Sequence, residues 1–577
     1  MSADPSDALR ADTMRAPYYG LPPPEGMSMI RLPLDAEQRS YLTERSRSSD
    51  SDSIYSINTL LNTSAPINRL PVELLVMIMK WVQVVVGCRD KAAVEWLSML
   101  LVCRHWFVVA STGPRLWYAL WAGSSLNLLR TGLARSKETE ILIVLKRPSA
   151  LGGALECITP HAHRIRHLFL SNVPQVDAPL LSQFMRISMP ALATFHALVS
   201  KTVADLSDVL IDLTPEAHPS LIDLHVGGVH LSPSPVFRQL RSFRFSGCFG
   251  LAPHLRVNKF LDILRNCINA VVLDISDVFC RGSRQPPPAL RRSAQVVLSK
   301  LAMGYIKVQA GTIRHILSAF VLPASAHALM MWATDEVSTE DELGSGFCAV
   351  MPNDRSGLPI LRVATHLEVK ACRYHRRLIA TAPTLSSENA LRLLPGIILA
   401  INASKAPLRV AGLEDVLDIC RTMPLETASL KLTPFLTEEL NWDTFLFPFR
   451  GLRVLTLINR ARSGEAGGVR RLLRALEPDH VPNGTPAEDG VLCPRLRIVR
   501  IEGFDACLAD IPAAVLECVQ KRKDALGQGD GLEKLELHFR GFKSKEGFER
   551  QKQLFMSKVL ELVRQASFEC DLEEFSE

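Results

Sequence analysis

The sequence predicts an α+β protein in which a small all-helical domain precedes an irregular α/β domain made of short repeated units. Two observations lead to this expectation. Residues 67–121 carry apolar side chains at the helical period, and from residue 165 onward a short apolar phrase recurs along the chain. We therefore expect a helical domain at 66–122 and an α/β domain at 123–577, with loop insertions around 280–440.

The first 65 residues differ in composition from the rest. They contain PYYGLPPPEGM and RSRSSDSDS and show no sustained hydrophobic period. Such composition buries too little apolar surface to offset the entropy of ordering, so residues 1–65 are predicted to be mostly disordered. The serines from Ser46 to Ser53 could accept phosphate, although a solvated linker explains them more simply.

The helical domain is expected to begin at about Pro71. Proline suits the first turn of a helix, and Glu73 places a carboxylate near the positive end of the helix dipole. The apolar residues that follow form one wide stripe at the helical period. They are Leu74, Leu75, Ile78, Trp81 and Val82.

More apolar helix follows from Trp96 onward, continuing past Trp106 until Ser111–Pro114 breaks the run before Trp117. Short helices within about 50 residues form a marginal core by themselves. Some of this apolar surface should therefore face another chain. The alternative is an ordinary bundle packed on its own C-terminal domain.

The order of these signals resembles the F-box. A Leu-Pro start at Leu70 leads into an apolar helix, then a Val-Cys-Arg-x-Trp segment at 102–106, then Pro-x-Leu-Trp at 114–117. The resemblance implies docking of the Skp-type adaptor of cullin-RING ubiquitin ligases. Carried over residue by residue, the implied contact residues are Leu70, Pro71, Leu74, Leu75, Ile78, Val102, Cys103, Trp106, Leu116 and Trp117.

The resemblance extends to about residue 145. Leu133–Lys137 followed by Ile141 and Ile143 looks like the Arg-Ser turn and first strand found after the F-box in many proteins of mushroom-forming fungi. One departure lies between Trp81 and Trp96, where the connection is longer than the usual turn and lacks the common Pro-x-Asp. This departure keeps open a second function, that of a non-catalytic scaffold that does not engage a cullin.

The α/β domain repeats a phrase close to Leu-x-x-Leu-x-Leu. Its first copies begin about 20 to 30 residues apart, near the period of leucine-rich repeats. Each phrase predicts a short strand, and stacked units of strand and helix would share one core. The phrases are Ile165/Leu168/Leu170, Leu192/Phe195/Ala197, Leu221/Leu224/Val226, Leu240/Phe243/Phe245, Ala270/Leu273/Ile275, Leu452/Leu455/Leu457, Leu496/Val499/Ile501 and Leu532/Leu535/Leu537.

Residues 280–440 fit the phrase poorly. THLEVK and ASLKLTP look like strands there, whereas SRQPPPAL, DEVSTEDELGSG and MPNDRSGLP look like loops. We expect an irregular leucine-rich-repeat-like α/β solenoid. A compact α+β domain with long loops is the alternative.

Composition narrows the function classes. The chain has 577 residues, is 47% hydrophobic and carries a net charge of +6, which is too weak to indicate nucleic acid or an anionic membrane as the partner. The N-terminus lacks the pattern of a secretory signal, and the longest apolar run, LLVMIMKWVQVVV, is too short to span a bilayer. The 13 cysteines are scattered singly, which favours reduced thiols. These features predict a cytoplasmic or nuclear protein without a membrane partner.

The sequence contains no motif that indicates catalysis. Gly-rich phosphate loops, GxSxG, HExxH and CxxC are absent. His161 and His163 are spaced to share a metal, but without a nearby acidic residue or cysteine they are better explained as surface histidines. The basic cluster Lys370, Arg373, His375, Arg376 and Arg377 suits either an anionic ligand or a charged strand edge. No cofactor or metal is expected.

These observations predict an adaptor and not an enzyme. In the favoured hypothesis, the helical domain docks a Skp-type adaptor and through it a cullin, while the repeat domain holds a protein substrate. Catalysis would then arise from proximity to the recruited ubiquitin-conjugating enzyme. The sequence does not name the substrate, because fold does not imply target.

Overall fold

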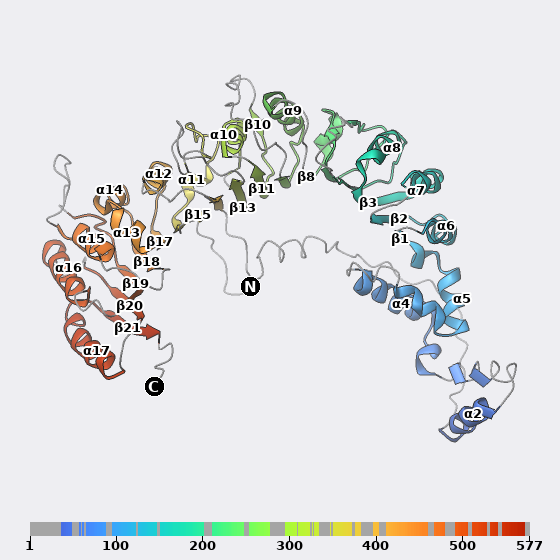
Figure 1. Cartoon of the computed structure of the whole chain (residues 1–577), viewed down its shortest axis with the longest axis horizontal. Coiled ribbons are helices and arrows are strands. Elements are labelled where there is room, and N and C mark those ends of the chain that lie inside the picture. The colour runs from blue at the N-terminus through green and yellow to red at the C-terminus, as the bar shows by residue number, and fades with distance from the viewer. Residues whose placement is uncertain are drawn as a thin grey trace. The chain divides into compact units, whose positions relative to one another are not determined.

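A computed structural model divides the chain into two compact units, unit 1 (Met1–Val144) and unit 2 (Leu145–Glu577) (Figure 1). It describes residues 36–48, 57–58, 61–62, 65–87, 95–122, 125–146, 151–200, 210–246, 253–276, 295–308, 310–323, 326, 328–333, 347, 350–371, 375–381, 396–402, 411–459, 467–478, 491–505, 511–527, 531–540 and 545–571. Among these residues, no helix combines the length and the apolar character needed to cross a lipid bilayer.

Unit 1 is mostly helical. Its elements are α2 (Ala36–Ser48), η1 (Pro66–Arg69), α4 (Val72–Gly87), η2 (Glu95–Leu101), α5 (Arg104–Thr112), η3 (Pro114–Trp117), β1 (Ala119–Ala122), α6 (Leu126–Arg135) and β2 (Ile141–Lys146), at which the unit ends. The strand expected from Ile141 and Ile143 is therefore present. Helix α4 begins next to Pro71, whose carbonyl accepts the backbone hydrogen bond of Leu75, as the sequence predicts.

The core of unit 1 is built around Trp117. Its ring packs edge-on against that of Trp96, with centroids 5.2 Å apart. The buried amide of Gln83, on α4, donates to the carbonyl oxygens of Leu116 and Ala119 at 3.2 and 3.4 Å. These bonds satisfy the amide nitrogen of Gln83, whereas its Oε1 is buried without a hydrogen-bond partner among the described residues. Gln83 thus ties α4 to the segment that leads into β1.

Helix α2 lies within the stretch expected to be disordered. Its sequence AEQRSYLTERSRS contains good helix formers, and the hydroxyl of Thr43 donates to the carbonyl of Arg39 at 2.8 Å. The prediction of disorder for residues 1–65 is therefore wrong at this helix. It relied on hydrophobic periodicity, and this segment has too few apolar residues to show one. Ser46 and Ser48 lie at its C-terminal end, whereas Ser49, Ser51 and Ser53 fall outside the described residues.

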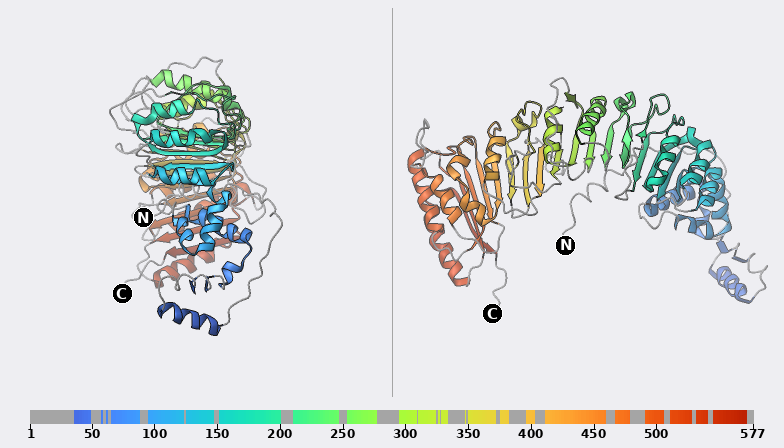
Figure 2. Two further views of the ribbon diagram at one scale, coloured as in Figure 1. Left: turned by 90° about the vertical axis from the view of Figure 1, so that its right-hand side faces the viewer. Right: turned by 45° about the horizontal axis from the view of Figure 1, so that its top comes forward.

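Unit 2 contains a large, mostly parallel sheet with helices along one face (Figure 2). The strands of this sheet are β3 (Ile165–Val173), β4 (Thr194–Val199), β6 (Asp223–Gly227), β8 (Ser242–Ser246), β9 (Val272–Ser276), β11 (Met303–Val308), β13 (Ala328–Ala333), β14 (His366–Ala371), β15 (His375–Thr381), β16 (Gly396–Asn402), β17 (Thr427–Leu432), β18 (Val454–Asn459), β19 (Ile498–Asp505), β20 (Lys534–Arg540) and β21 (Gln565–Asp571). Short strands β5 (Leu210–Ile211) with β7 (His230–Leu231), and β10 (Val296–Val297) with β12 (Phe320–Val321), pair separately.

The α-helices of unit 2 connect successive strands. They are α7 (Leu151–Ile158), α8 (Ala178–Phe184), α9 (Pro253–Asn266), α10 (Ala310–Ala319), α11 (Ile360–Val363), α12 (Ala411–Cys420), α13 (Pro434–Glu439), α14 (Trp442–Leu446), α15 (Gly467–Ala475), α16 (Ile511–Leu526) and α17 (Lys545–Val559). Short 3-10 turns η4 (Thr159–Arg164), η5 (Gln175–Asp177) and η6 (Pro235–Gln239) complete the connections. The chain is thus a mixed α/β protein with a large parallel-rich sheet, as expected in outline.

The repeated phrases form the buried side of this sheet. Every residue of the phrases named above is buried, and each phrase leads into or lies within one strand. The parallel register aligns them, so that Phe195 is opposite Leu224 and Leu455 is opposite Val499. The predicted inward orientation of Leu224, Leu455 and Leu535 is confirmed.

The poorly fitting region continues the same sheet with weaker phrases. Gly304 occupies the position of the second leucine, opposite Leu273 and Leu329, and an added Cβ would come within 2.6 Å of the Leu329 side chain. Alanine substitutes elsewhere, at Ala364 before β14 and at Ala428 in β17. The phrase was missed because small residues have replaced leucine.

This region also reverses the strand order. The chain runs β13, β14, β15, β16 and β17, but the sheet runs β13-β16-β15-β14-β17. Strand β15 is antiparallel to both of its neighbours, whereas β16 is parallel to β13 and β14 is parallel to β17. The sheet therefore stays continuous through the reversal.

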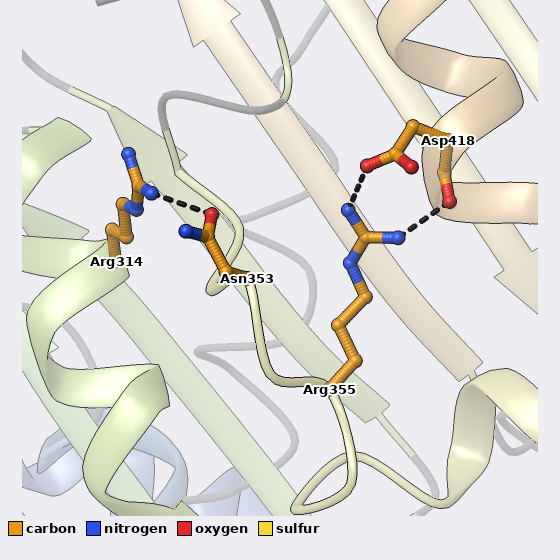
Figure 3. A network of polar contacts seen from close by, with 4 residues as sticks. All are labelled: Arg314, Asn353, Arg355 and Asp418. Carbon is orange, nitrogen blue, oxygen red and sulfur yellow. Dashed lines mark hydrogen bonds and ion pairs between the residues drawn. The ribbon is translucent and has the colours of Figure 1, made fainter.

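A polar network fastens the segment before β14 to its neighbours (Figure 3). Arg314 of α10 donates to the side-chain oxygen of Asn353 at 2.6 Å. The guanidinium of Arg355 binds both the carboxylate and the backbone carbonyl of Asp418 on α12. Residues 351–359, expected to be a loop, are thus an irregular segment held by specific hydrogen bonds.

Candidate functional site

Helix α4 carries two apolar stripes on adjacent faces. Leu75, Met79 and Gln83 recur at i, i+4 and i+8 and are buried. Leu74, Met77 and Trp81 recur at i, i+3 and i+7, and their side chains are 44%, 59% and 72% exposed. A helix that is apolar on two faces but buries only one leaves surface for a partner.

The next two elements add to this exposed apolar surface. Leu101, at the end of η2, is 85% exposed, and Val102 follows it in the connection to α5. Phe107 and Val108 of α5 are also exposed. Elements α4, η2 and α5 pack against one another. We call these side chains the apolar surface of unit 1: Leu74, Met77, Trp81, Leu101, Val102, Phe107 and Val108.

The residues implied by the F-box resemblance differ in exposure. Pro71, Leu74 and Val102 are exposed, while Leu70, Ile78 and Cys103 are partly exposed. Four others are buried within unit 1 and support the surface without forming it. These are Leu75, Trp106, Leu116 and Trp117.

The two buried tryptophans each have a hydrogen-bond partner for the indole N–H, which offsets the cost of removing that group from water. Trp106 donates to the side-chain oxygen of Asn68. Trp117 donates to the carbonyl of Ala110 at 2.7 Å. Trp117 follows the Gly-Pro break, yet it lies in η3 and its ring is buried in the core, as is that of Trp106.

Sequence reasoning missed Met77, Leu101, Phe107 and Val108 as exposed residues, and it placed Trp81 in the same stripe as Leu75. The hydrophobic period alone does not say which of the two apolar stripes of α4 faces inward. Gln83 identifies the buried stripe only once its hydrogen-bond partners in residues 116–119 are known.

Cationic groups border this part of unit 1. The guanidinium of Arg135 lies over the rings of Trp117 and Phe107, at 4.7 and 5.9 Å from their centroids. Burial of Lys80, together with the nearby charge of Arg115, lowers the pKa of the Lys80 ammonium. Such cation–π contacts stabilise ring positions by about 0.5 to 2 kcal/mol.

The second candidate site is the face of the unit 2 sheet opposite the helices, which we call the open face (Figure 2). Side chains alternate along each strand, so residues between the buried positions point to this face. The register aligns them in rows across neighbouring strands. One row, in spatial order, is Phe169, His196, His225, Arg244, Asp274, Tyr305, Met330, Ile398, Ile379, Glu368, Ser429, Thr456, Arg500, Glu536 and Ser567.

The first strands of the open face carry a histidine cluster. Nε2 of His196 lies 3.5 Å from a carboxylate oxygen of Asp223, and its ring contacts those of Phe169 and His225. Burial by itself would raise the pKa of Asp223, but the neighbouring His196 and Ser242 side chains and the charge of Arg244 lower the pKa overall. Asp223 is therefore a carboxylate that lies beside an imidazole.

The last strands of the open face carry ion pairs. Lys431 of β17 lies 3.1 Å from a carboxylate oxygen of Glu368. Glu536 of β20 binds both Arg500 and, at 2.6 Å, Lys534. Pairs at this level of exposure contribute little stability, on the order of 0 to 1 kcal/mol each. Glu368 and Glu536 thus each lie beside at least one cation on this face.

Of the two residue groups singled out for metal or anion binding, the histidines lie on η4, whereas Lys370 and Arg377 of the basic cluster lie on strands of the open face. His161 and His163 are on η4, where Nδ1 of His161 is 3.2 Å from the guanidinium of Arg164. Among the described residues, no group of three or more possible metal ligands occurs. Of the basic cluster, Lys370 and Arg377 face each other across β14 and β15, while Arg373 lies outside the described residues.

Comparison with known proteins adds no family assignment. No protein-family model and no curated protein sequence matches this chain.

Proposed function

We propose that this chain is a substrate-recognition adaptor of a cullin-RING ubiquitin ligase. Unit 1 docks a Skp-type adaptor as an F-box does, and through it a cullin. Unit 2 acts as a leucine-rich-repeat-like solenoid and holds a protein substrate on its open face. The chain itself makes and breaks no bond, because its role is to bring substrate and charged conjugating enzyme together.

The apolar surface of unit 1 carries the proposal. A large exposed side chain such as Trp81, at 72% exposure, costs free energy in water that burial against a partner recovers, at about 25 cal/mol per Å². Tryptophan and other large apolar residues are also enriched among side chains that dominate binding. The sequence order from Leu70 to Trp117 adds the identity of the partner, since it resembles the F-box.

The open face supports the second half of the proposal. Rows of solvent-facing side chains on a rigid parallel sheet offer a shared frame for a partner, and only a few of them need to be specific. Phe169, Tyr305 and Trp332 supply aromatic contacts on this face, and charged groups are interspersed between them.

Co-purification of the full chain with its bound proteins, identified by mass spectrometry, tests the proposal. We expect a Skp-type adaptor and a cullin with the parent chain, and less of both with Leu70→Ala/Pro71→Ala. The matched control is Leu554→Ala/Leu560→Ala, because both leucines are exposed but lie in unit 2. Recovery of an adaptor without a cullin would favour the scaffold function. Recovery of neither an adaptor nor a cullin would refute the proposal.

A further inference from the structure

The strand reversal gathers cationic side chains beside an exposed tryptophan. In register across β11, β13, β16, β15, β14 and β17 lie Lys307, Trp332, Ala400, Arg377, Lys370 and Lys431. We call Lys307, Trp332, Arg377, Lys370 and Lys431 the basic–aromatic row. Directly opposed residues share a face of the sheet, so these side chains project together on the open face.

An aliphatic row runs alongside it. Met330, Ile398 and Ile379 are register neighbours on β13, β16 and β15. On each strand they lie two residues from the basic–aromatic row, on the same face of the sheet. All three are partly exposed, and Trp332 is 39% exposed. On a solvent-facing sheet surface, such a group leaves apolar area for a partner to cover.

Among the described residues of these rows and of β9 beside them, four cations accompany two carboxylates: Lys307, Arg377, Lys370 and Lys431 against Glu368 and Asp274. Glu368 is the carboxylate in register beside Ile379, and it pairs with Lys431 at 3.1 Å. Asp274 lies at the other edge, next to Tyr305. Arg377 makes no ion pair within the described part of the chain, and its Nε is buried there without a hydrogen-bond partner. The formal charge of the described residues in these rows is therefore positive.

From this juxtaposition we infer that the basic–aromatic and aliphatic rows bind an extended acidic peptide segment that carries at least one large apolar side chain. The inference rests on the proposed substrate-holding role of unit 2 and names the substrate class. Carboxylates of the segment pair with Arg377 and the lysines, and its apolar side chain packs on Trp332 and the aliphatic row.

The dimensions fit a short segment. Six neighbouring strands at about 4.8 Å spacing span roughly 24 Å, which an extended peptide covers in about seven residues. A nucleic acid fits less well, because the row beside the cations is aliphatic and would leave a sugar-phosphate backbone against Met330, Ile398 and Ile379. Peptide is therefore the favoured occupant.

Fluorescence polarisation with the full chain tests the inference. The probe is a labelled peptide of about seven residues that alternates Glu with neutral residues around a central Leu. Two matched peptides replace either all Glu by Gln or the Leu by Ser. A labelled single-stranded oligonucleotide serves as the nucleic-acid probe. We expect the Glu/Leu peptide to bind most tightly, each replacement to weaken binding about tenfold or more, and added salt to weaken it further.

The protein variants place the site. Lys370→Gln/Arg377→Gln should lose about tenfold or more of the affinity, and Trp332→Ala should lose affinity for the Leu peptide but not for its Ser counterpart. Arg500→Gln/Lys534→Gln, which removes two cations farther along the same face, should bind as the parent does. Circular dichroism melting verifies that each variant folds.

Two outcomes would overturn the inference: equal binding of the Glu and Gln peptides, or tighter binding of the oligonucleotide that depends on Lys370 and Arg377. If the peptide inference fails but the Lys370→Gln/Arg377→Gln preparation still binds the Skp-type adaptor, the proposed ligase function stands. If the peptide binds but no adaptor co-purifies, only the ligase function is refuted.

Discussion

The indole N–H of Trp117 reaches back over η3 to the carbonyl of Ala110, 2.7 Å away, and closes the end of α5 against the core of unit 1. The same ring packs against Trp96 and beneath the guanidinium of Arg135. Trp117 is thus the side chain on which α5, η2 and α6 converge. The apolar surface outside depends on this buried support.

We predict that Trp106→Ala and Trp117→Ala both destabilise unit 1, each by about 3 to 5 kcal/mol, as truncations of buried aromatic side chains do. Trp81→Ala, at an exposed position, should change stability by no more than about 0.5 kcal/mol. Limited proteolysis of the full chain, with cleavage between residues 67 and 121 as the readout, measures the difference. Resistance of Trp117→Ala equal to that of the parent would contradict its place in the core.

The inward side of the unit 2 sheet yields a second prediction. Leu224→Ala, Leu455→Ala and Leu535→Ala should each lower the free energy of unfolding by about 2 to 5 kcal/mol, because each leucine is buried in the core of unit 2. Ile222→Ala, at an exposed position just before β6, is the control. Chemical denaturation gives the values, and a Leu224 variant as stable as the Ile222 variant would refute the assigned packing.

The prediction of these leucines from sequence succeeded because apolar residues kept a fixed spacing before and within each strand. Between β9 and β18 the strands at THLEVK and ASLKLTP were predicted correctly, as β14 and β17, but the leucine phrase was not recognised, for two physical reasons. Small residues such as Gly304 and Ala428 took the leucine positions, so the phrase lost its signature although the positions stayed buried. The reversal of β14 to β16 depends on pairing between distant segments, which local pattern does not encode.

The candidate site in unit 1 was predictable in position but not in orientation. Leu74 and Leu75 are equally apolar, yet Leu75 is buried and Leu74 is exposed, and Gln83, on the stripe of Leu75, bonds to the carbonyls of residues 116 and 119. That contact spans more than 30 residues of sequence. Of the basic–aromatic row, the sequence indicated Lys370 and Arg377 as part of a basic cluster. It did not indicate Trp332, which comes close to Arg377 only through the strand reversal.

Arg522 of α16 gives a third prediction. Its guanidinium is buried and donates to the carbonyls of Leu476, Leu492 and Cys493 at 2.8 to 2.9 Å. Arg522→Met should lower the free energy of unfolding by about 3 kcal/mol, because these buried carbonyls lose their donor. Arg474→Met, at an exposed position of α15, should have little effect. Equal denaturation midpoints for the two variants would show that Arg522 does not hold these segments.

The pH dependence of stability gives a fourth prediction. Burial lowers the pKa of His218 below its usual value of 6.5, opposed in part by a backbone hydrogen bond at Thr214. The unfolded chain therefore binds a proton more readily, so stability is present above pH 6.5 and falls as the pH drops below it. His315 and His366 have pKa values lowered by burial and act in the same direction.

His218→Leu should reduce the loss of stability below pH 6.5, relative to the parent. His163→Leu, at an exposed position of η4, is the matched control and should leave the pH profile unchanged. Denaturant unfolding across this pH range measures both. A His218→Leu profile as steep as that of the parent would assign the acid sensitivity to other groups.

The docking of a Skp-type adaptor by the apolar surface of unit 1 is tested most directly by calorimetric titration of the purified adaptor into the full chain. The parent should bind, Met77→Ser/Trp81→Ser should bind at least about tenfold more weakly, and Leu554→Ser/Leu560→Ser in unit 2 should match the parent. Equal affinities for the parent and Met77→Ser/Trp81→Ser, or no binding by the parent, would contradict the account.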